Sequence, residues 1–227
     1  MAEDVGGAEP QAGLSRERVL REAMRLADEH GMDALSMRKL ASVLGAGAMS
    51  LYHYVANKEE LLDGMVDLVF AEIELPTGEG DWREVMRRQL ASARDVLVRH
   101  PWAVPLMESR TNAGPAGLRY REAVTACLRR AGFSIEMTAH ANWLLSSCLY
   151  GYVLQEVNLP FDTAEDLAEM ADEVYLPLLA PDRYPYLSET ASTLLAGGYD
   201  HTVEFEFGLD VVLEALERLR VRFAERG

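Results

Sequence analysis

Apolar residues recur every three to four positions along most of the chain, and this spacing gathers them on one face of a helix. The first such stretch predicts a helix that begins after Ser15, a residue type that caps helix N-termini, and continues to His30. Gly31 follows as the expected helix-ending residue. A second, shorter helix is expected to begin after Ser36 and to end near Gly45. The start of the pattern therefore predicts two helices joined by a short turn.

The glycine-containing turn at 45–47 leads into a third short helix, which is predicted over 48–54. Two short helices joined by such a turn form a helix-turn-helix unit. Asn57, with an acidic residue at the third helical position after it, starts a fourth helix that we expect to span 57–75. The stretch 77–80, Thr-Gly-Glu-Gly, has the composition of a linker, so we place a domain boundary there.

Beyond this linker the helical pattern resumes, and the sequence shows no convincing strand pattern. Residues 203–207 alternate briefly, but the apolar residues after them keep helical spacing, so we predict a helix there too. The stretch 180–200, rich in Pro, Tyr and Gly, is predicted to be a long loop or a partly ordered segment. The helices of this second part are expected at 81–100, 104–109, 115–130, 135–157, 164–179 and 202–223.

The predicted fold class is all-α, with an N-terminal three-helix helix-turn-helix head on a larger helical body. Residues 1–13, which are acidic and rich in small side chains, are expected to form a disordered tail. The head and its connecting helix are assigned to 14–75, and a body for dimerisation and effector binding to 81–227. Because the chain has neither an apolar run of roughly 18 residues nor a signal-peptide pattern, we expect a cytoplasmic protein without a membrane partner.

The formal net charge of −15 argues against a protein that coats nucleic acid non-specifically, since such proteins need extended basic surfaces. The charge is uneven, however, because seven basic residues nearly balance eight acidic ones over 14–64. Both lysines of the chain, Lys39 and Lys58, lie in this segment. A nearly neutral head on an acidic body would approach DNA with the head only.

No arrangement of residues that is characteristic of catalysis appears in the sequence. The chain has no GxSxG nucleophile motif, no phosphate-binding glycine loop and no HExxH zinc motif. Cys127 and Cys148 lie within apolar helical patterns, which predicts reduced, packed thiols. His53 has no further metal-ligand residue at a suitable spacing. We therefore predict that the protein is not an enzyme and uses no metal or cofactor.

Residues 14–75 carry three motifs in register, namely Leu35-Ser36-Met37-Arg38-Lys39-Leu40-Ala41, Leu51-Tyr52-His53-Tyr54-Val55 and Asn57-Lys58-Glu59 with Leu61-Leu62. Together they resemble the head of the tetracycline-repressor (TetR) family of transcriptional regulators. The resemblance implies binding to double-stranded operator DNA, with the recognition helix in the major groove and the start of the fourth helix at a phosphate. The expected DNA-facing residues are Arg38, Lys39, Ala48, Met49, Ser50, Tyr52, His53, Tyr54 and Lys58.

The side chains of the recognition helix limit how bases are read. Ala48 and Met49 cannot form the bidentate hydrogen bonds that recognise purines, so we expect direct readout mainly from Arg38. Tyr52 and Tyr54 have two interpretations: their rings pack in the small core of the head, or their hydroxyls face DNA as the family pattern implies. The expected core of the head consists of Leu40, Leu44, Leu51 and Val55.

Two segments of the body, 132–136 and 205–210, resemble the branch of the family nearest the tetracycline repressors. In that family the corresponding long helices of two subunits form a four-helix bundle. The resemblance therefore implies a homodimer through 135–157 and 202–223, which would present two heads to a palindromic operator. The alternative is that these helices belong only to the intramolecular core.

The family's bodies hold an inducer cavity, and the resemblance implies one here for an unknown small-molecule effector. Met and aromatic residues at helical spacing are also typical of plain core, so both interpretations stand. Where tetracycline repressors have a metal-chelating glutamate, this chain has Gln155, so a magnesium–tetracycline complex is not the expected effector. The candidate lining residues are Met86, Gln89, Trp102, Met107, His140, Trp143, Ser147 and Gln155.

The function implied is that of a dimeric, sequence-specific regulator. The residues do not distinguish a repressor from an activator, and repression is the family's usual mode. A small-molecule effector would release it from DNA by favouring a body conformation that misplaces the heads, with the helix at 57–75 transmitting the change. The alternative is a ligand-independent DNA-binding module whose body binds another protein. A fully packed body would favour this alternative, whereas a cavity of about 300–1,000 Å³ would argue against it.

Overall fold

The computed structural model describes residues 14–78, 80–110, 114–160, 166, 170–171 and 176–224, and within these ranges the regular structure is entirely helical. The predicted tail at 1–13 and most of the helix predicted at 164–179 lie outside the described residues; a short 3-10 helix, Leu176–Leu178, ends that region. Among the described residues no helix is long and apolar enough to cross a membrane. The all-α prediction is confirmed.

The first two helices of the head begin and end where the sequence predicts. In α1 (Arg16–His30) the Ser15 hydroxyl accepts a hydrogen bond from the Arg18 amide at 3.2 Å. Gly31 then turns the chain out of the helix at a φ of 76°, a conformation that side chains disfavour. Ser36 caps α2 (Met37–Val43) in the same way. Local capping chemistry thus sets both helix starts.

The third helix, α3 (Ala48–Leu51), is shorter than the predicted 48–54, so that boundary is wrong. The His53 amide donates to the Ser50 carbonyl at 3.3 Å, and the Tyr54 amide to the Leu51 carbonyl at 2.9 Å. These bonds span three residues instead of four, so the chain tightens and leaves the α-helix after one turn.

The connecting helix, α4 (Lys58–Glu72), has the predicted start but ends three residues before the predicted Leu75. At its start the Asn57 side chain accepts from the Glu60 amide at 2.8 Å, and the Glu60 carboxylate accepts from the Ala56 amide at 2.7 Å. At its end Ile73 is extended and buried, and the Glu74 amide donates to the Ser92 hydroxyl at 3.0 Å. Docking against α5 therefore overrides the helical pattern.

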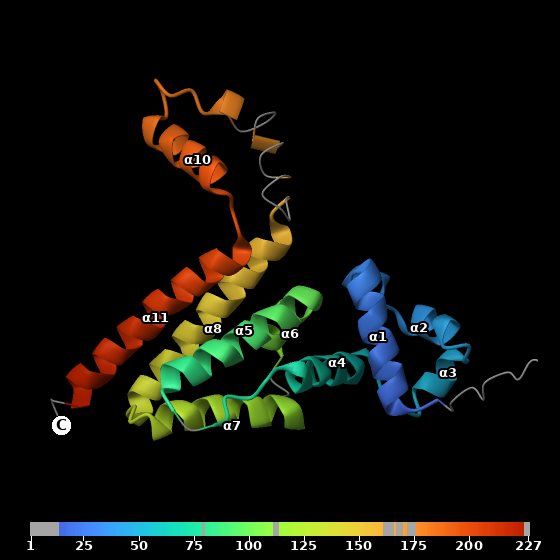
Figure 1. Cartoon of the computed structure of the whole chain (residues 1–227). Helices are drawn as coiled ribbons and strands as arrows, with labels where there is room; N and C mark the ends of the chain where they lie inside the picture. The colour runs from blue at the N-terminus through green and yellow to red at the C-terminus, as the bar shows by residue number, and fades with distance from the viewer. Residues whose placement is uncertain are drawn as a thin grey trace, which may run out of the picture.

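The body packs around long helices whose predicted bounds hold to within one or two residues. Figure 1 shows α8 and α11 running side by side along one side of the molecule, with α5 and α6 between them and α4 and with α7 running below them against α4 and α8. Cys127 is buried and Cys148 half-buried, both are free thiols, and burial raises the pKa of each. The body helices are α5 (Trp82–Arg99), α6 (Ala103–Ser109), α7 (Pro115–Arg130), α8 (Ile135–Asn158) and α11 (His201–Ala224).

The stretch 180–200 contains a helix, α10 (Pro185–Gly197), so the loop predicted there is wrong. Pro185 occupies the first turn, where its missing amide hydrogen costs nothing, and Gly198 ends the helix at a φ of 74°. Hydroxyls within the helix donate back to carbonyls one turn earlier, as Thr190 does to Tyr186 at 2.8 Å. Figure 1 shows α10 projecting beyond the ends of α8 and α11.

Trp82 and Glu217 join α5 to α11 through a contact that should respond to acid. The Arg220 guanidinium and the Trp82 indole, whose Nε1 lies 2.9 Å from a Glu217 oxygen, lower the pKa of that carboxyl to about 2. A depressed carboxyl pKa contributes stability above the unfolded value, and this contribution disappears as pH falls through the folded one. We expect Glu217→Gln to cost about 1 kcal/mol near neutral pH, with the difference from wild type vanishing by about pH 2.

Urea unfolding at several pH values, followed by tryptophan fluorescence, measures this difference. Glu214→Gln is the matched control, because the Glu214 carboxylate on the same helix is 63% exposed and pairs only with the exposed Arg218 within the described residues. Its effect should be small at every pH. A Glu217→Gln deficit that stays constant down to acid pH would contradict the assignment.

Candidate nucleic-acid interface and effector cavity

The structure exposes most of the predicted DNA-facing side chains on one end of the molecule. Met49, on α3, is 78% exposed, which is unusual for a large apolar side chain that serves only the core. Tyr52 is 44% exposed, whereas Tyr54 is half-buried and packs against the core of the head. The core-packing interpretation thus applies at least in part to Tyr54. The exposed members of the set are Arg38, Lys39, Ala48, Met49, Ser50, Tyr52, His53 and Lys58.

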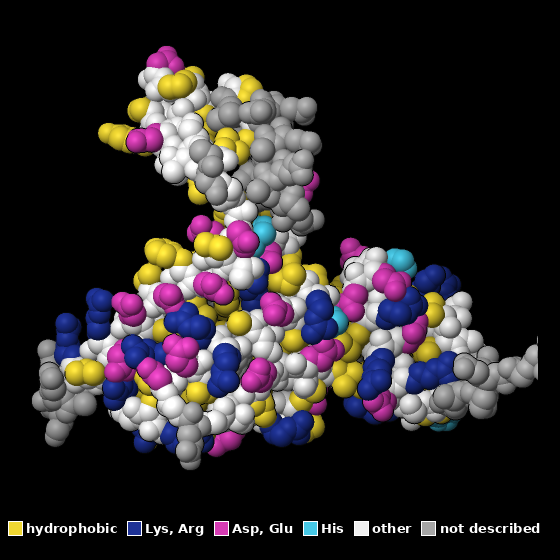
Figure 2. Space-filling model, viewed as in Figure 1, with side chains coloured by type: hydrophobic (Ala, Val, Ile, Leu, Met, Phe, Trp, Pro, Cys, Tyr) yellow, Lys and Arg dark blue, Asp and Glu magenta, His cyan; other side chains and the backbone are white. Residues whose placement is uncertain are grey.

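The cations of the head fall into two groups. Arg21 pairs with Glu17 at 2.6 Å, and Arg25 pairs with two glutamates of its own helix. Arg38, Lys39 and Lys58, by contrast, form no ion pair with any residue that the structure describes. Figure 2 shows acidic side chains scattered over the visible face of the body. Positive charge that is not neutralised internally is therefore available at α2 and the start of α4, as phosphate binding requires.

Behind this surface the head has a compact core that fixes α3 and α4. Leu40, Leu51 and Val55 are at most 1% exposed, as predicted for core residues, and Leu44 is half-buried. Gly64 allows α4 to pack tightly on α1, because a Cβ there would lie 2.7 Å from a methyl carbon of Leu20. The position of α4 therefore determines where the head sits.

A cavity of about 620 Å³ lies in the body between α4, α5, α6, α7 and α8. Four of the eight predicted lining residues lie in its wall: Met86, Gln89, Met107 and Trp143. The other residues of the wall were not among those predicted from the sequence, although several on α7 share the four-residue spacing of a helix face. These are Phe70, Leu90, Glu108, Arg110, Tyr120, Arg121, Val124, Thr125, Asn142, Leu145, Ser146 and Tyr150.

The structure places the remaining four candidates away from this cavity. The Trp102 indole donates to the Asp28 carboxylate of α1 at 2.6 Å, so it joins the head to the body. His140 is exposed, with its ring 3.9 Å from the Glu136 carboxylate on the same helix. Ser147 and Gln155 are exposed on α8. Periodicity predicted which helices are amphipathic, but it did not show which side of α8 faces the cavity.

The cavity wall contains polar groups whose hydrogen bonding is incomplete. The Gln89 amide nitrogen donates to the Tyr120 hydroxyl at 3.1 Å, and the Asn142 amide nitrogen to the Thr125 hydroxyl at 3.3 Å. The side-chain oxygens of Gln89 and Asn142 are buried, and neither accepts a hydrogen bond from the described residues. Burial raises the pKa of Tyr120, so its phenol is neutral. An unpaired buried acceptor is costly, so this wall favours a guest that donates hydrogen bonds.

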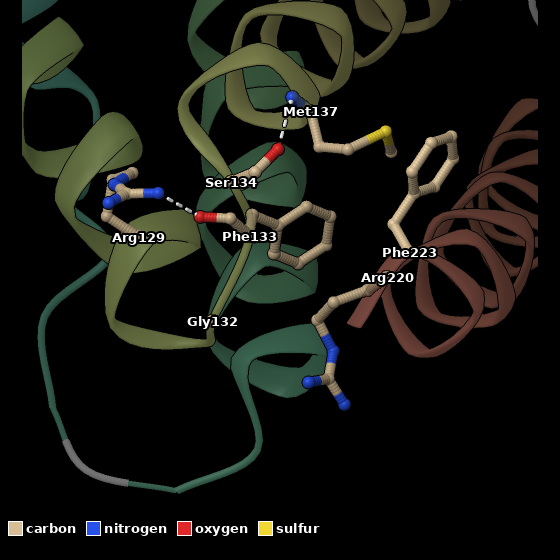
Figure 3. Close-up of a pocket in the computed structure, with 7 residues that line it drawn as sticks. All are labelled: Arg129, Gly132, Phe133, Ser134, Met137, Arg220 and Phe223. Carbon is tan, nitrogen blue, oxygen red and sulfur yellow. Dashed lines mark hydrogen bonds between the residues drawn. The ribbon is translucent and has the colours of Figure 1, made fainter. Parts of the chain in front are cut away.

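A second, smaller pocket of about 250 Å³ lies where the turn between α7 and α8 meets the end of α11 (Figure 3). Its polar groups are already engaged: Arg129 donates to the Phe133 carbonyl, and the Ser134 hydroxyl accepts from the Met137 amide at 3.1 Å. With its small volume and satisfied groups it is the weaker candidate for a ligand. Among the described residues no group of three or more potential metal ligands comes together.

Comparison with known proteins matches both parts of the chain. A model described as "Bacterial regulatory proteins, tetR family" matches residues 19–65, and one described as "Tetracyclin repressor-like, C-terminal domain" matches residues 76–220. The chain belongs to the TetR family. The match covers the head and the body, so the family resemblance seen in the sequence is confirmed. TetR-family proteins are DNA-binding transcriptional regulators, and the prediction that the chain is not an enzyme is confirmed with it.

Relatives of this TetR-family chain include named repressors. It is 33% identical over 223 residues to the HTH-type transcriptional repressor DrrR1 of Streptomyces coeruleorubidus, covering 92% of this chain and 80% of the relative. It is 28% identical over 211 residues to the class C tetracycline repressor protein of Escherichia coli, covering 92% and 93%.

Solved structures support the same fold. Apo ActR from Streptomyces coelicolor superposes with a TM-score of 0.77 at 31% identity, covering 93% of this chain and 98% of ActR. ActR in complex with actinorhodin gives a TM-score of 0.75 at 31% identity, covering 92% and 99%.

Proposed function

We propose that the chain is a homodimeric, sequence-specific repressor that a small molecule bound in the 620 Å³ cavity releases from a palindromic operator. The observation that carries the proposal is that α4 belongs to both sites. Phe70, near its end, lies in the cavity wall, and Lys58, its first residue, is exposed and belongs to the predicted DNA-facing set. A ligand that prefers one position of α4 by about 1.4 kcal/mol would change operator affinity tenfold.

Exposed apolar residues on α8 and α11 support the dimer. On α11, Val203, Phe207 and Val211 follow one another at four-residue spacing and are between 54% and 68% exposed. On α8, Ile135 is 79% exposed and Leu154 is 42% exposed. Large apolar side chains along two neighbouring helices form a surface that monomeric proteins rarely leave in water. A second copy of this surface would bury it and provide two heads for two half-sites.

The cavity favours a ligand-responsive regulator over a ligand-independent module whose body binds another protein. Its volume lies within the usual range for small-molecule sites, and its buried Gln89 and Asn142 oxygens lack partners in the described structure. We therefore expect an effector with an apolar body and hydrogen-bond donors. Since ActR has been solved with actinorhodin, that compound is the first to test here. Magnesium–tetracycline is not expected, because Gln155 carries no charge and is exposed.

The proposed function is tested by fluorescence anisotropy on labelled DNA from the region upstream of the chain's own gene, beside scrambled DNA. We expect binding that exceeds the scrambled control by about 10³ and weakens with salt. Arg38→Ala should weaken operator binding by about 10-fold to 100-fold, because one base-reading contact is worth about 1–3 kcal/mol. The matched control is Arg21→Ala, which removes an arginine already paired with Glu17 on the outside of α1.

Equal, weak binding of wild type to both DNAs, over a set of candidate operators, would refute the proposal. A loss for Arg21→Ala as large as that for Arg38→Ala would show that general charge, and not the recognition surface, supplies the binding.

A further inference from the structure

Arg110 connects the cavity to the connecting helix through charged hydrogen bonds. It follows α6, its side chain is 14% exposed, and it lies in the cavity wall. From there its Nε donates to the carboxylate of Asp63 on α4, and its Nη2 donates to the Glu59 carbonyl at 2.8 Å. The same nitrogen also donates to the Glu59 carboxylate at 2.9 Å. One cavity residue thus holds two consecutive turns of α4.

The next turn of α4 is held by the body as well. The Asp67 carboxylate accepts from the amides of Ala116 and Gly117 at 2.8 and 2.9 Å, at the start of α7. Glu59, Asp63 and Asp67 are spaced four residues apart, so they form one acidic stripe along α4. Body groups bind the whole stripe.

The contacts of Arg110 and the contacts of Asp67 differ in whether a ligand in the cavity can reach them. Asp67 accepts from backbone amides, which are fixed at the start of α7. Asp67, Ala116 and Gly117 do not line the cavity. The Arg110 side chain, by contrast, lines the cavity and can rotate toward another acceptor. A guanidinium binds carboxylates and other oxyanions in a fixed fork, so a ligand oxygen there competes directly with Asp63 and Glu59.

We infer that Arg110 is a positioning residue. The occupant of the cavity determines whether Arg110 holds α4, and with it the head, in one position. The inference rests on the proposed function. With the cavity free of a competing acceptor, Arg110 holds α4 in the position that suits two half-sites. A ligand bearing a carboxylate, a phenolate or a carbonyl near Arg110 draws the guanidinium away and releases the first turns of α4.

The test measures anisotropy on two duplexes, the complete operator and a single half-site at low salt, at a temperature where circular dichroism shows every variant folded. Arg110→Gln and Asp63→Asn each remove one side of the same contact. We expect each to weaken binding to the complete operator about tenfold and to leave half-site binding unchanged, because one head alone needs no fixed position. The double variant should lose no more than Arg110→Gln alone, because replacing Arg110 already breaks its contact with Asp63.

Arg119→Gln is the matched control, because Arg119 is an exposed arginine on α7 that lies outside the cavity wall and forms no ion pair within the described residues. It should bind both duplexes as wild type does. Arg110→Lys keeps the charge without the fork, and a loss smaller than tenfold is expected. If Arg110→Gln does not fold, Arg110→Lys and Asp63→Asn make the same comparison.

Two results would overturn the inference while the proposed function stands. In the first, wild type binds the operator specifically and Arg110→Gln and Asp63→Asn bind it equally well. In the second, these variants lose half-site and full-site binding alike, which would mean damage to the head and not to its position. If wild type binds no operator, the proposed function fails, and this inference fails with it.

Discussion

Replacing Phe207 with aspartate is expected to convert the dimer into monomers and to lower affinity for the complete operator by about 10³-fold. Phe207 is 68% exposed in the single chain, so the substitution removes little from the core of the subunit. In the proposed dimer the same position lies in the middle of the apolar α11 stripe. An unpaired carboxylate buried there costs several kcal/mol, and two copies meet at one interface.

Light scattering after size-exclusion chromatography measures the mass, and anisotropy measures the affinity. The control is Leu118→Asp, which also places a carboxylate at an exposed apolar position, 59% exposed on α7, a helix outside the proposed interface. We expect it to remain dimeric with unchanged operator affinity. If Phe207→Asp keeps the mass of a dimer, the α8 and α11 surface is not the interface.

Replacing Arg94 with alanine is expected to lower the free energy of unfolding by about 3–5 kcal/mol, and the melting temperature by about 10 °C. Arg94 is 8% exposed on α5, and its Nε and Nη2 each donate to an oxygen of Glu156 on α8 at 2.8 Å. Its guanidinium also lies 5.5 Å from the centre of the Phe205 ring on α11. Truncation would leave the Glu156 carboxylate unpaired among three helices.

Thermal and urea unfolding measure this loss. Arg218→Ala, which breaks an exposed pair with Glu214, should cost less than about 1 kcal/mol. The double variant Arg94→Met with Glu156→Leu should recover much of the loss, because it removes both charges together. A cost for Arg94→Ala no larger than that for Arg218→Ala would show that the buried pair does not hold α5 to α8.

The sequence predicted the helix starts most accurately, because the groups that set them are neighbours in the chain. Ser15, Ser36 and Asn57 each cap the helix that follows them. The errors arose where a distant contact decides. Ile73 leaves α4 early because it is buried and the next amide bonds to α5, and neither event is visible in the local pattern. The helix α10 was missed because its proline and glycine mark its two ends, whereas the composition of 180–200 suggested a loop.

The DNA-facing residues were also predicted more accurately than the cavity residues, for the same reason. The DNA-facing set came from motifs in register, and the structure exposes eight of its nine members. Half of the predicted cavity residues lie in the wall, since a periodic pattern shows which residues face inward but not where the interior is hollow. Trp102 is the clearest case, because its indole bonds to Asp28 across the junction of head and body. The contact of Arg110 with Asp63 on α4 joins residues 47 positions apart, so no local sequence pattern predicts it.

The cavity draws most of its wall from α5, α7 and α8, while Phe70 is the residue that α4 contributes to it. The surface that would meet DNA is built from α2, α3, the turn that follows α3 and the first residue of α4. Substitutions that reshape the cavity therefore fall on different residues from those that face the bases. A lineage of such proteins can acquire a new chemical signal while keeping its old target genes, and a laboratory library confined to α7 and α8 would sample new sensors for an unchanged promoter.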